Sequence, residues 1–164
     1  MFHVVLNVRN SALAVLFSAF LATCLSAAAQ SAARTPVCTG TPADQVQVVE
    51  TMRTMYAAAA TDDLAKFHTV AAPDFYAFDG GTRYDGDTLM NTLKALHASG
   101  KVYVWSVTQP HVESDCHLAW ITYINRGSLE DKSGKHDLTW LESAVLEKHA
   151  GAWRIRFFHS TRVP

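Results

Sequence analysis

Residues 138–161 read LTWLESAVLEKHAGAWRIRFFHST, and this stretch decides how the rest of the chain is interpreted. Two runs rich in aromatic and β-branched residues flank a turn at Ala150–Gly151, which predicts a β-hairpin. Pairing the two strands across that turn places Glu142 opposite His159, beyond a run of apolar pairs. Because paired residues share a face and lie about 5 Å apart, the hairpin predicts an apolar face that ends in a carboxylate–imidazole pair.

A histidine held by a carboxylate can act as a general acid or base near neutral pH, so Glu142 and His159 are candidate catalytic residues. The same pair is also open to a second interpretation, as a buried hydrogen-bonded link between two strands. Ser160 adjoins His159 but points to the opposite face, which disfavours a serine–histidine–acid triad. Pairing across the loop before this hairpin brings Trp120 and Thr122 close to the pair, with a register that is open by one residue.

The segments upstream predict a helix, a shorter helix, a hairpin, a third helix and then four strands. Thr41 is a good N-cap, Pro42 suits the first helical position, and Pro73 stops the second helix. Gly100 ends the third helix, and Pro110 predicts a bulge in the strand that follows. Helices segregated on one side of a bent antiparallel sheet make an α+β fold.

This order resembles the nuclear transport factor 2-like superfamily over roughly residues 42–162. The hairpin, with its Gly-x-Trp-x-Ile turn and its His-Ser end, looks like the closing hairpin of SnoaL-like domains, and TDDLAKFHTVAAPDFYAF also has a counterpart there. The resemblance implies a cone of three N-terminal helices packed on a bent antiparallel sheet, with the SnoaL-like domain at 41–164.

The superfamily includes ketosteroid isomerases, polyketide cyclases, epoxide hydrolases and dehydratases, and some members only bind or assemble. The fold therefore does not fix the reaction. No known catalytic set maps onto this chain residue by residue.

Aromatic side chains around a few polar groups are typical of a small-molecule pocket. Several of these side chains are equally open to interpretation as core residues. A metal site in HVESDCH, residues 111–117, is disfavoured because a turn would interrupt the alternating ligands, and no cofactor is expected. The expected ligand contacts are Tyr56, Tyr76, Trp105, Trp120, Thr122, Trp140 and Phe157.

Residues 1–29 contain Arg9, no acidic residue, and an apolar stretch that ends in small residues. This pattern predicts a secretory signal peptide cleaved after Ala29, followed by a linker at 30–40. Two alternatives stay open: an uncleaved membrane anchor, and a lipoprotein modified at Cys24. We expect a periplasmic or secreted protein without a membrane span after cleavage.

The composition and the cysteines suggest partners and a disulfide. The whole chain has 14 basic and 15 acidic residues with no basic run, which disfavours nucleic acid as a partner. A sheet apolar on both faces predicts a homodimer. Outside the cytoplasm Cys38 and Cys116 are expected to form a disulfide, the alternative being two separate thiols.

Overall fold

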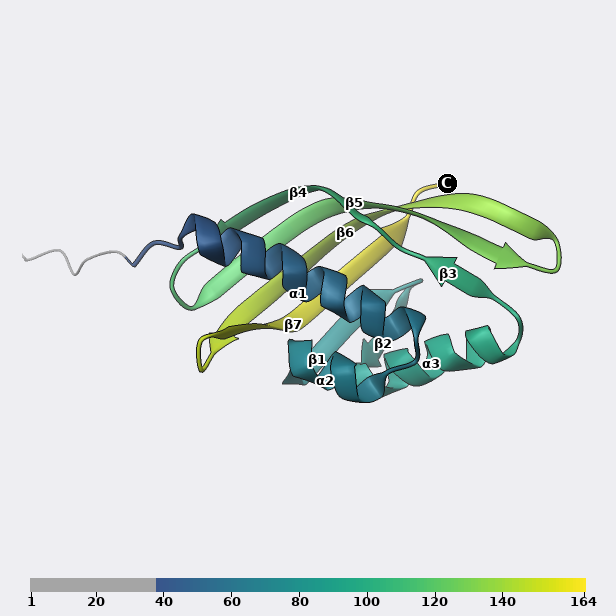
Figure 1. Ribbon diagram of the computed structural model, residues 1–164, viewed down its shortest axis with the longest axis horizontal. Coiled ribbons are helices and arrows are strands. Elements are labelled where there is room, and N and C mark those ends of the chain that lie inside the picture. Colours follow the sequence, from purple (N-terminus) through teal and green to yellow (C-terminus); the bar gives the residue numbers. More distant parts are fainter. Residues whose placement is uncertain (1–37) are drawn as a thin grey trace, which may run out of the picture. The chain divides into compact units, whose positions relative to one another are not determined.

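The computed structural model describes residues 38–164, and Figure 1 shows their course. Within this range the helices are α1 (Pro42–Ala60), α2 (Leu64–Val70) and α3 (Gly86–Ala98). The strands are β1 (Ala71–Asp79), β2 (Thr82–Asp85), β3 (Val102–Val104), β4 (Val107–Ser114), β5 (Leu118–Asp131), β6 (Gly134–His149) and β7 (Ala152–Arg162). The predicted order of elements is confirmed, with the predicted strand around Pro110 divided into β3 and β4.

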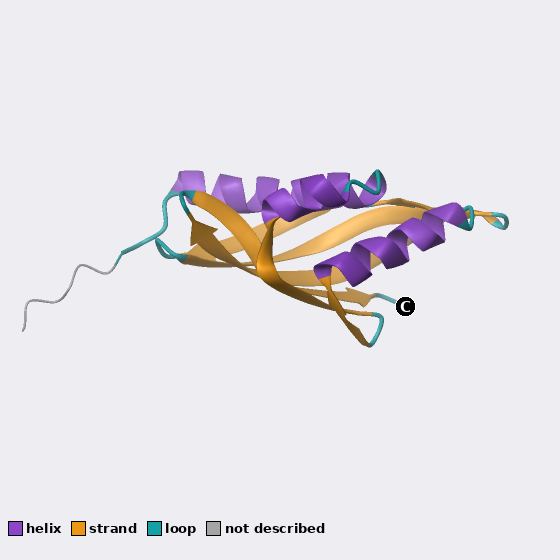
Figure 2. Cartoon of the chain, turned by 90° about the horizontal axis from the view of Figure 1, so that it is seen from below, coloured by secondary structure: helices purple, strands orange, loops and turns teal. Residues whose placement is uncertain are grey.

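The sheet is mixed rather than wholly antiparallel. Its order is β2-β1-β7-β6-β5-β3, and β4 also pairs with β5. Strand β1 runs parallel to β7, so the expected antiparallel sheet needs this correction. Parallel neighbours need a long connection between them, and here most of the domain, from β2 to β6, lies between β1 and β7 in the sequence. Figure 2 shows the helices over one face of the sheet, which we call the inner face.

The start of helix α1 is fixed by a capping box and by the sheet. Thr41 accepts a hydrogen bond from the backbone N–H of Asp44, and the Asp44 carboxylate accepts one from the backbone N–H of Thr41. The same carboxylate accepts hydrogen bonds from Lys148 Nζ at 2.6 Å and from Trp153 Nε1 at 3.1 Å. These bonds tie the first turn of α1 to the β6–β7 hairpin, so the rest of the helix lies across the sheet.

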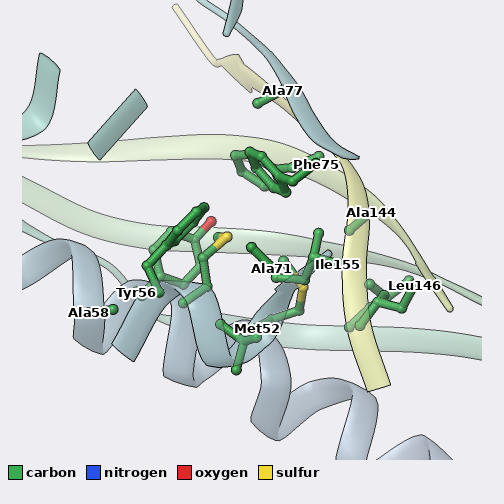
Figure 3. Packing of buried hydrophobic residues seen from close by; sticks show 14 of the residues in the cluster. Met52, Tyr56, Ala58, Ala71, Phe75, Ala77, Ala144, Leu146 and Ile155 are labelled. Carbon is green, nitrogen blue, oxygen red and sulfur yellow. The ribbon is translucent and has the colours of Figure 1, made fainter. Parts of the chain in front are cut away.

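The hydrophobic core lies between α1 and the inner face of the sheet. Met52 of α1 and Leu146 and Ile155 of the hairpin are fully buried, and Figure 3 shows them close together in the packing. The alternation in the closing hairpin therefore does bury the apolar face that the sequence predicts, as far as Ile155.

A β-bulge beyond Ile155 changes the register of the closing hairpin. Leu146 pairs with Ile155 as expected, but Val145 pairs with Phe157, so Arg156 is the additional residue on β7. One extra residue exchanges the two faces of a strand. Glu142 consequently lies opposite Ser160, and the predicted pairing of Glu142 with His159 is wrong.

The register between β5 and β6 also differs from the expected one by a single residue. Trp120 pairs with Val145 and Thr122 with Ser143, so neither lies beside Glu142. The residue opposite Glu142 on β5 is Tyr123. The predicted bulge near Pro110 is present, with a register shift between Thr108 and His111.

The segment before α1 is attached to the β4–β5 turn. Cys38 and Cys116 form a disulfide with their Cα atoms 5.5 Å apart, as predicted. The expected signal peptide and most of the linker lie outside the described residues. In residues 38–164 no helix has both the length and the apolarity needed to span a bilayer.

Replacing both cysteines with serine should lower the free energy of unfolding by about 2–4 kcal/mol, because the bridge closes a long loop in the unfolded chain. Urea titration of the double variant and the oxidised protein measures the difference. Unreduced, denatured protein should contain no reactive thiol at Cys38 or Cys116. Two titratable thiols at these positions would contradict the disulfide.

Candidate functional site

A cavity of about 260 Å³ lies between the inner face of the sheet and helices α1 and α3. Its walls are mostly apolar, and a few polar groups reach it from α1 and from three strands of the sheet. This combination is typical of a small-molecule site. The apolar wall includes Met55, Leu89, Met90, Leu93 and Phe158, and the polar lining includes Tyr56, Asp79, Glu142, Ser160 and Arg162.

Glu142 is a buried carboxylate held by neutral donors. The Tyr56 hydroxyl donates to Oε2, Ser160 Oγ donates to Oε1 at 3.1 Å, and Asn125 Nδ2 lies 3.3 and 3.2 Å from the two oxygens. A carboxylate has about four acceptor positions, so these donors nearly fill it. Glu142 thus joins α1, β5 and β7 at one point of the cavity wall.

Two further hydrogen bonds fix the orientation of these donors. The Tyr56 proton is committed to Glu142, so Tyr123 donates to the Tyr56 oxygen, at 2.9 Å. Asn125 Oδ1 accepts from the backbone N–H of Ser106 at 2.8 Å, which leaves its amide NH₂ to face Glu142. Tyr56 and Glu142 are therefore held in one arrangement by the protein itself.

Burial dominates the electrostatics of this network. Burial raises the pKa of Glu142, although the hydrogen bonds from Tyr56 and the other donors act in the opposite direction. Burial also raises the pKa of Tyr56 well above its usual value, and the neighbouring Tyr123 and Glu142 raise it further. Tyr56 is thus a neutral hydrogen-bond donor at physiological pH.

Asp79 is the second carboxyl group of the cavity. It stands at the end of β1, before Gly80 and Gly81, which both adopt positive φ in the turn to β2. Burial raises its pKa, opposed by a hydrogen bond from the Gly80 backbone and by the nearby His159. Within residues 38–164 no side chain donates a hydrogen bond to Asp79, so it keeps acceptor capacity for a ligand.

An aromatic stack forms one wall of the cavity. The ring of Trp105 lies between those of Tyr56 and Tyr103, with centroids 5.6 and 5.5 Å away. Trp140 is a further lining residue, from β6. Of the predicted ligand contacts, Tyr56, Trp105 and Trp140 therefore line this cavity together with Glu142.

The remaining predicted site residues lie on the opposite, outer face of the sheet. Tyr76 and Phe157 pack together there, with ring centroids 5.0 Å apart. His159 and Thr122 line a shallow outer groove, and the indole of Trp120 is partly exposed. The bulge at Arg156 accounts for Phe157 and His159, because beyond it these two residues take the outer face.

Sequence reasoning missed Tyr123, Asn125, Ser160 and Arg162 as members of the site, and left Asp79 unassigned. Asn125 offered a usable signal, because a fully buried amide in the middle of a strand needs polar partners. Tyr123 and Ser160 offered none, because their place beside Glu142 depends on the two registers.

A larger, more open cleft of about 690 Å³ lies between α2, the start of β1 and the start of α3. It contains a hydrogen-bonded pair, His68 Nε2 and Asp87 Oδ1, 2.7 Å apart. Both side chains are more than half exposed, so water solvates them. The inner cavity, with its buried carboxylate, is the stronger candidate site. No group of three potential metal ligands occurs among residues 38–164.

The raised pKa of Glu142 predicts a pH-dependent stability. Between the unfolded pKa of 4.5 and the higher folded value, the folded state binds more protons, so the free energy of unfolding falls as pH rises. The slope for one group is at most about 1.4 kcal/mol per pH unit. Glu142→Gln should remove this slope in urea titrations.

Glu147→Gln is the matched control on the same strand. Arg156 lowers the pKa of Glu147, so its contribution has the opposite sign and is lost as pH falls. Identical pH profiles for the wild type and Glu142→Gln would contradict the described role of Glu142.

Comparisons with known proteins agree with the fold of residues 38–164. The model of the SnoaL-like domain family matches residues 48–164. Among solved structures, a putative dehydratase of the nuclear transport factor 2-like family from Streptomyces avermitilis has a TM-score of 0.64 at 13% identity, covering 74% of this chain and 97% of that one.

Hub domains of calcium/calmodulin-dependent protein kinase II have the same fold. The hub homology domain from Chlamydomonas reinhardtii has a TM-score of 0.62 at 20% identity, covering 73% of this chain and 98% of that one. A putative association domain of this kinase from Xanthomonas campestris has a TM-score of 0.61 at 24% identity, covering 78% and 95%. No curated protein matched. The predicted resemblance is confirmed, and the chain belongs to the SnoaL-like domain family.

Proposed function

We propose that this protein binds a small, mostly apolar molecule in the inner cavity and transfers a proton to or from it through Asp79. The observation that carries the proposal is that one cavity is lined by two carboxyl groups with different numbers of hydrogen-bond donors. Glu142 has nearly all its acceptor positions filled by the protein, whereas Asp79 accepts only from the Gly80 backbone. Two carboxyl groups in different environments commonly divide acid–base and binding roles.

In this proposal Glu142 is a positioning residue. It holds the Tyr56 hydroxyl and the Asn125 amide, and these shape the polar end of the cavity. Burial raises the pKa of Asp79 above its usual value, which makes this carboxyl group a better proton acceptor than an ordinary surface aspartate. Isomerisation, dehydration and hydrolysis are the reaction types that such a group supports. We also propose that the protein acts after export, as its first 29 residues predict.

The first test identifies the ligand by native mass spectrometry of protein purified from its own host and then measures turnover. Asp79→Asn should lower kcat/KM by a factor of about 100 or more, the usual range for a lost general acid or base. Asp74→Asn is the control, because Asp74 lies on the same strand, is exposed and pairs with Arg156. Equal losses in the two variants would contradict the assignment of Asp79.

His159→Ala should leave both binding and turnover nearly unchanged, because the imidazole lies on the outer face. This expectation replaces the catalytic role that the sequence suggested for His159. A loss comparable to that of Asp79→Asn would place the site on the outer face instead.

The outer face of the sheet favours a second candidate function, assembly with a second copy. Leu118, Trp120, Leu141 and Phe78 on this face are between 39% and 54% exposed. The structural relatives include hub and association domains, which are named for assembly. Burying these apolar side chains against each other would support a homodimer.

Leu141→Lys should convert the predicted dimer to a monomer, because a charge would enter the centre of the contact. Val46→Lys is the control, since Val46 is at least as exposed as Leu141 but lies on α1. Light scattering at micromolar concentration measures the mass. A wild-type monomer would refute the dimer and leave the cavity proposal untouched.

A further inference from the structure

The inner cavity is lined by more acidic than basic side chains. Asp79 and Glu142 contribute carboxyl groups, and Arg162 contributes the only guanidinium among the lining residues that the structure describes. Neither carboxyl group has a lysine, arginine or histidine nitrogen within 4 Å in residues 38–164. The cavity therefore has two acidic groups without a direct counter-charge from the described chain.

Burial makes this imbalance energetically important. Glu142 is only 6% exposed, and its four hydrogen bonds come from neutral groups. Neutral donors stabilise a carboxylate but leave its charge in a low-dielectric surrounding, where an opposite charge interacts strongly. A positive charge brought by a ligand would relieve that cost.

Arg162 does not balance the two carboxyl groups. It lies at the end of β7, two residues beyond Ser160, and it is an exposed residue. Water and salt screen an exposed charge far more than a buried one. The two carboxyl groups thus lie inside the cavity without a cationic nitrogen within 4 Å, whereas the guanidinium of Arg162 lies toward solvent.

The size and the walls of the cavity limit the rest of the ligand. A volume of about 260 Å³ is just below the range of roughly 300–1,000 Å³ that is usual for small-molecule pockets, which suits a compact ligand. Tyr103, Trp105, Trp140 and Phe158 supply aromatic surface. Aromatic rings accept both apolar groups and organic cations.

We propose that the ligand of the inner cavity is an organic cation, an ammonium group on a compact apolar ring or chain, whose N–H groups donate to Asp79. The inference deepens the proposed function and rests on it only in taking this cavity as the binding site. The proton that Asp79 exchanges would then be one on the ligand nitrogen or on the carbon next to it.

Three probes of similar shape and different charge test which ligand charge the cavity prefers. They are 2-phenylethylammonium, 2-phenylethanol and phenylacetate. Calorimetric titration at about pH 8 keeps the amine protonated, since aliphatic amines lose their proton near pH 10. We expect the ammonium to bind at least tenfold more tightly than the alcohol, and the carboxylate to bind least.

Three variants distinguish the contribution of Asp79 to ammonium binding from that of Arg162. Asp79→Asn should weaken binding of the ammonium about tenfold and leave the alcohol unchanged. Asp74→Asn should affect neither probe, and Arg162→Gln should leave ammonium binding equal or stronger.

Binding of the alcohol or the carboxylate as tightly as the ammonium would overturn the inference while supporting the cavity as a ligand site. Ammonium binding that is unchanged in Asp79→Asn would also overturn it. If none of the probes binds at millimolar concentration, the charge inference fails, and the acid–base proposal still stands on turnover of the natural ligand.

Discussion

The hydrogen bond between the Tyr56 hydroxyl and the buried carboxylate of Glu142 connects the helical layer to the sheet. Removing either partner would leave the other as a buried polar group without its main partner, which is energetically unfavourable. The bond also decides what the cavity offers a ligand, because it fixes the direction of Tyr56 and occupies Glu142. Asp79 is consequently the carboxyl group that remains available.

The Arg156 bulge determines which residues join this interaction. Without it, His159 would face the cavity and Ser160 would face outward. Phe157 and Phe158 are both apolar, so the hydrophobic pattern of the sequence does not by itself decide between the two registers. Arg156 pairs with Glu147 and Asp74 on the outer side, and these contacts accompany the bulged register. Because of this one extra residue, Ser160 rather than His159 lies opposite Glu142.

Much of the fold follows from local sequence signals. The capping box at Thr41, the glycine turns and the alternation of the closing hairpin are short-range features that one sequence displays. The parallel pairing of β1 with β7 is not a short-range feature, because it joins segments that are far apart in the chain. Of the candidate residues predicted from the sequence, Glu142, Tyr56, Trp105 and Trp140 line the inner cavity, whereas the partners of Glu142 that depend on exact strand register could not be predicted.

The fold of this protein does not determine its function, which depends on the side chains that line the cavity. The family match and the structural relatives establish the SnoaL-like fold, and this fold supports enzymes and assembly domains alike. The inner face of this chain carries a carboxylate filled by hydrogen bonds, a second carboxyl group that keeps acceptor capacity, and aromatic walls. Its chemistry has to be argued from those groups rather than from the fold.

A double-mutant cycle on Tyr56→Phe and Glu142→Gln measures whether the hydrogen bond between these two residues joins the helical layer to the sheet. We expect that the two losses in the free energy of unfolding are not additive, with a coupling of about 1–3 kcal/mol, because each residue acts through the other. Losses that add to within about 0.3 kcal/mol would show that Tyr56 and Glu142 stabilise the protein independently, and would contradict the role of this hydrogen bond.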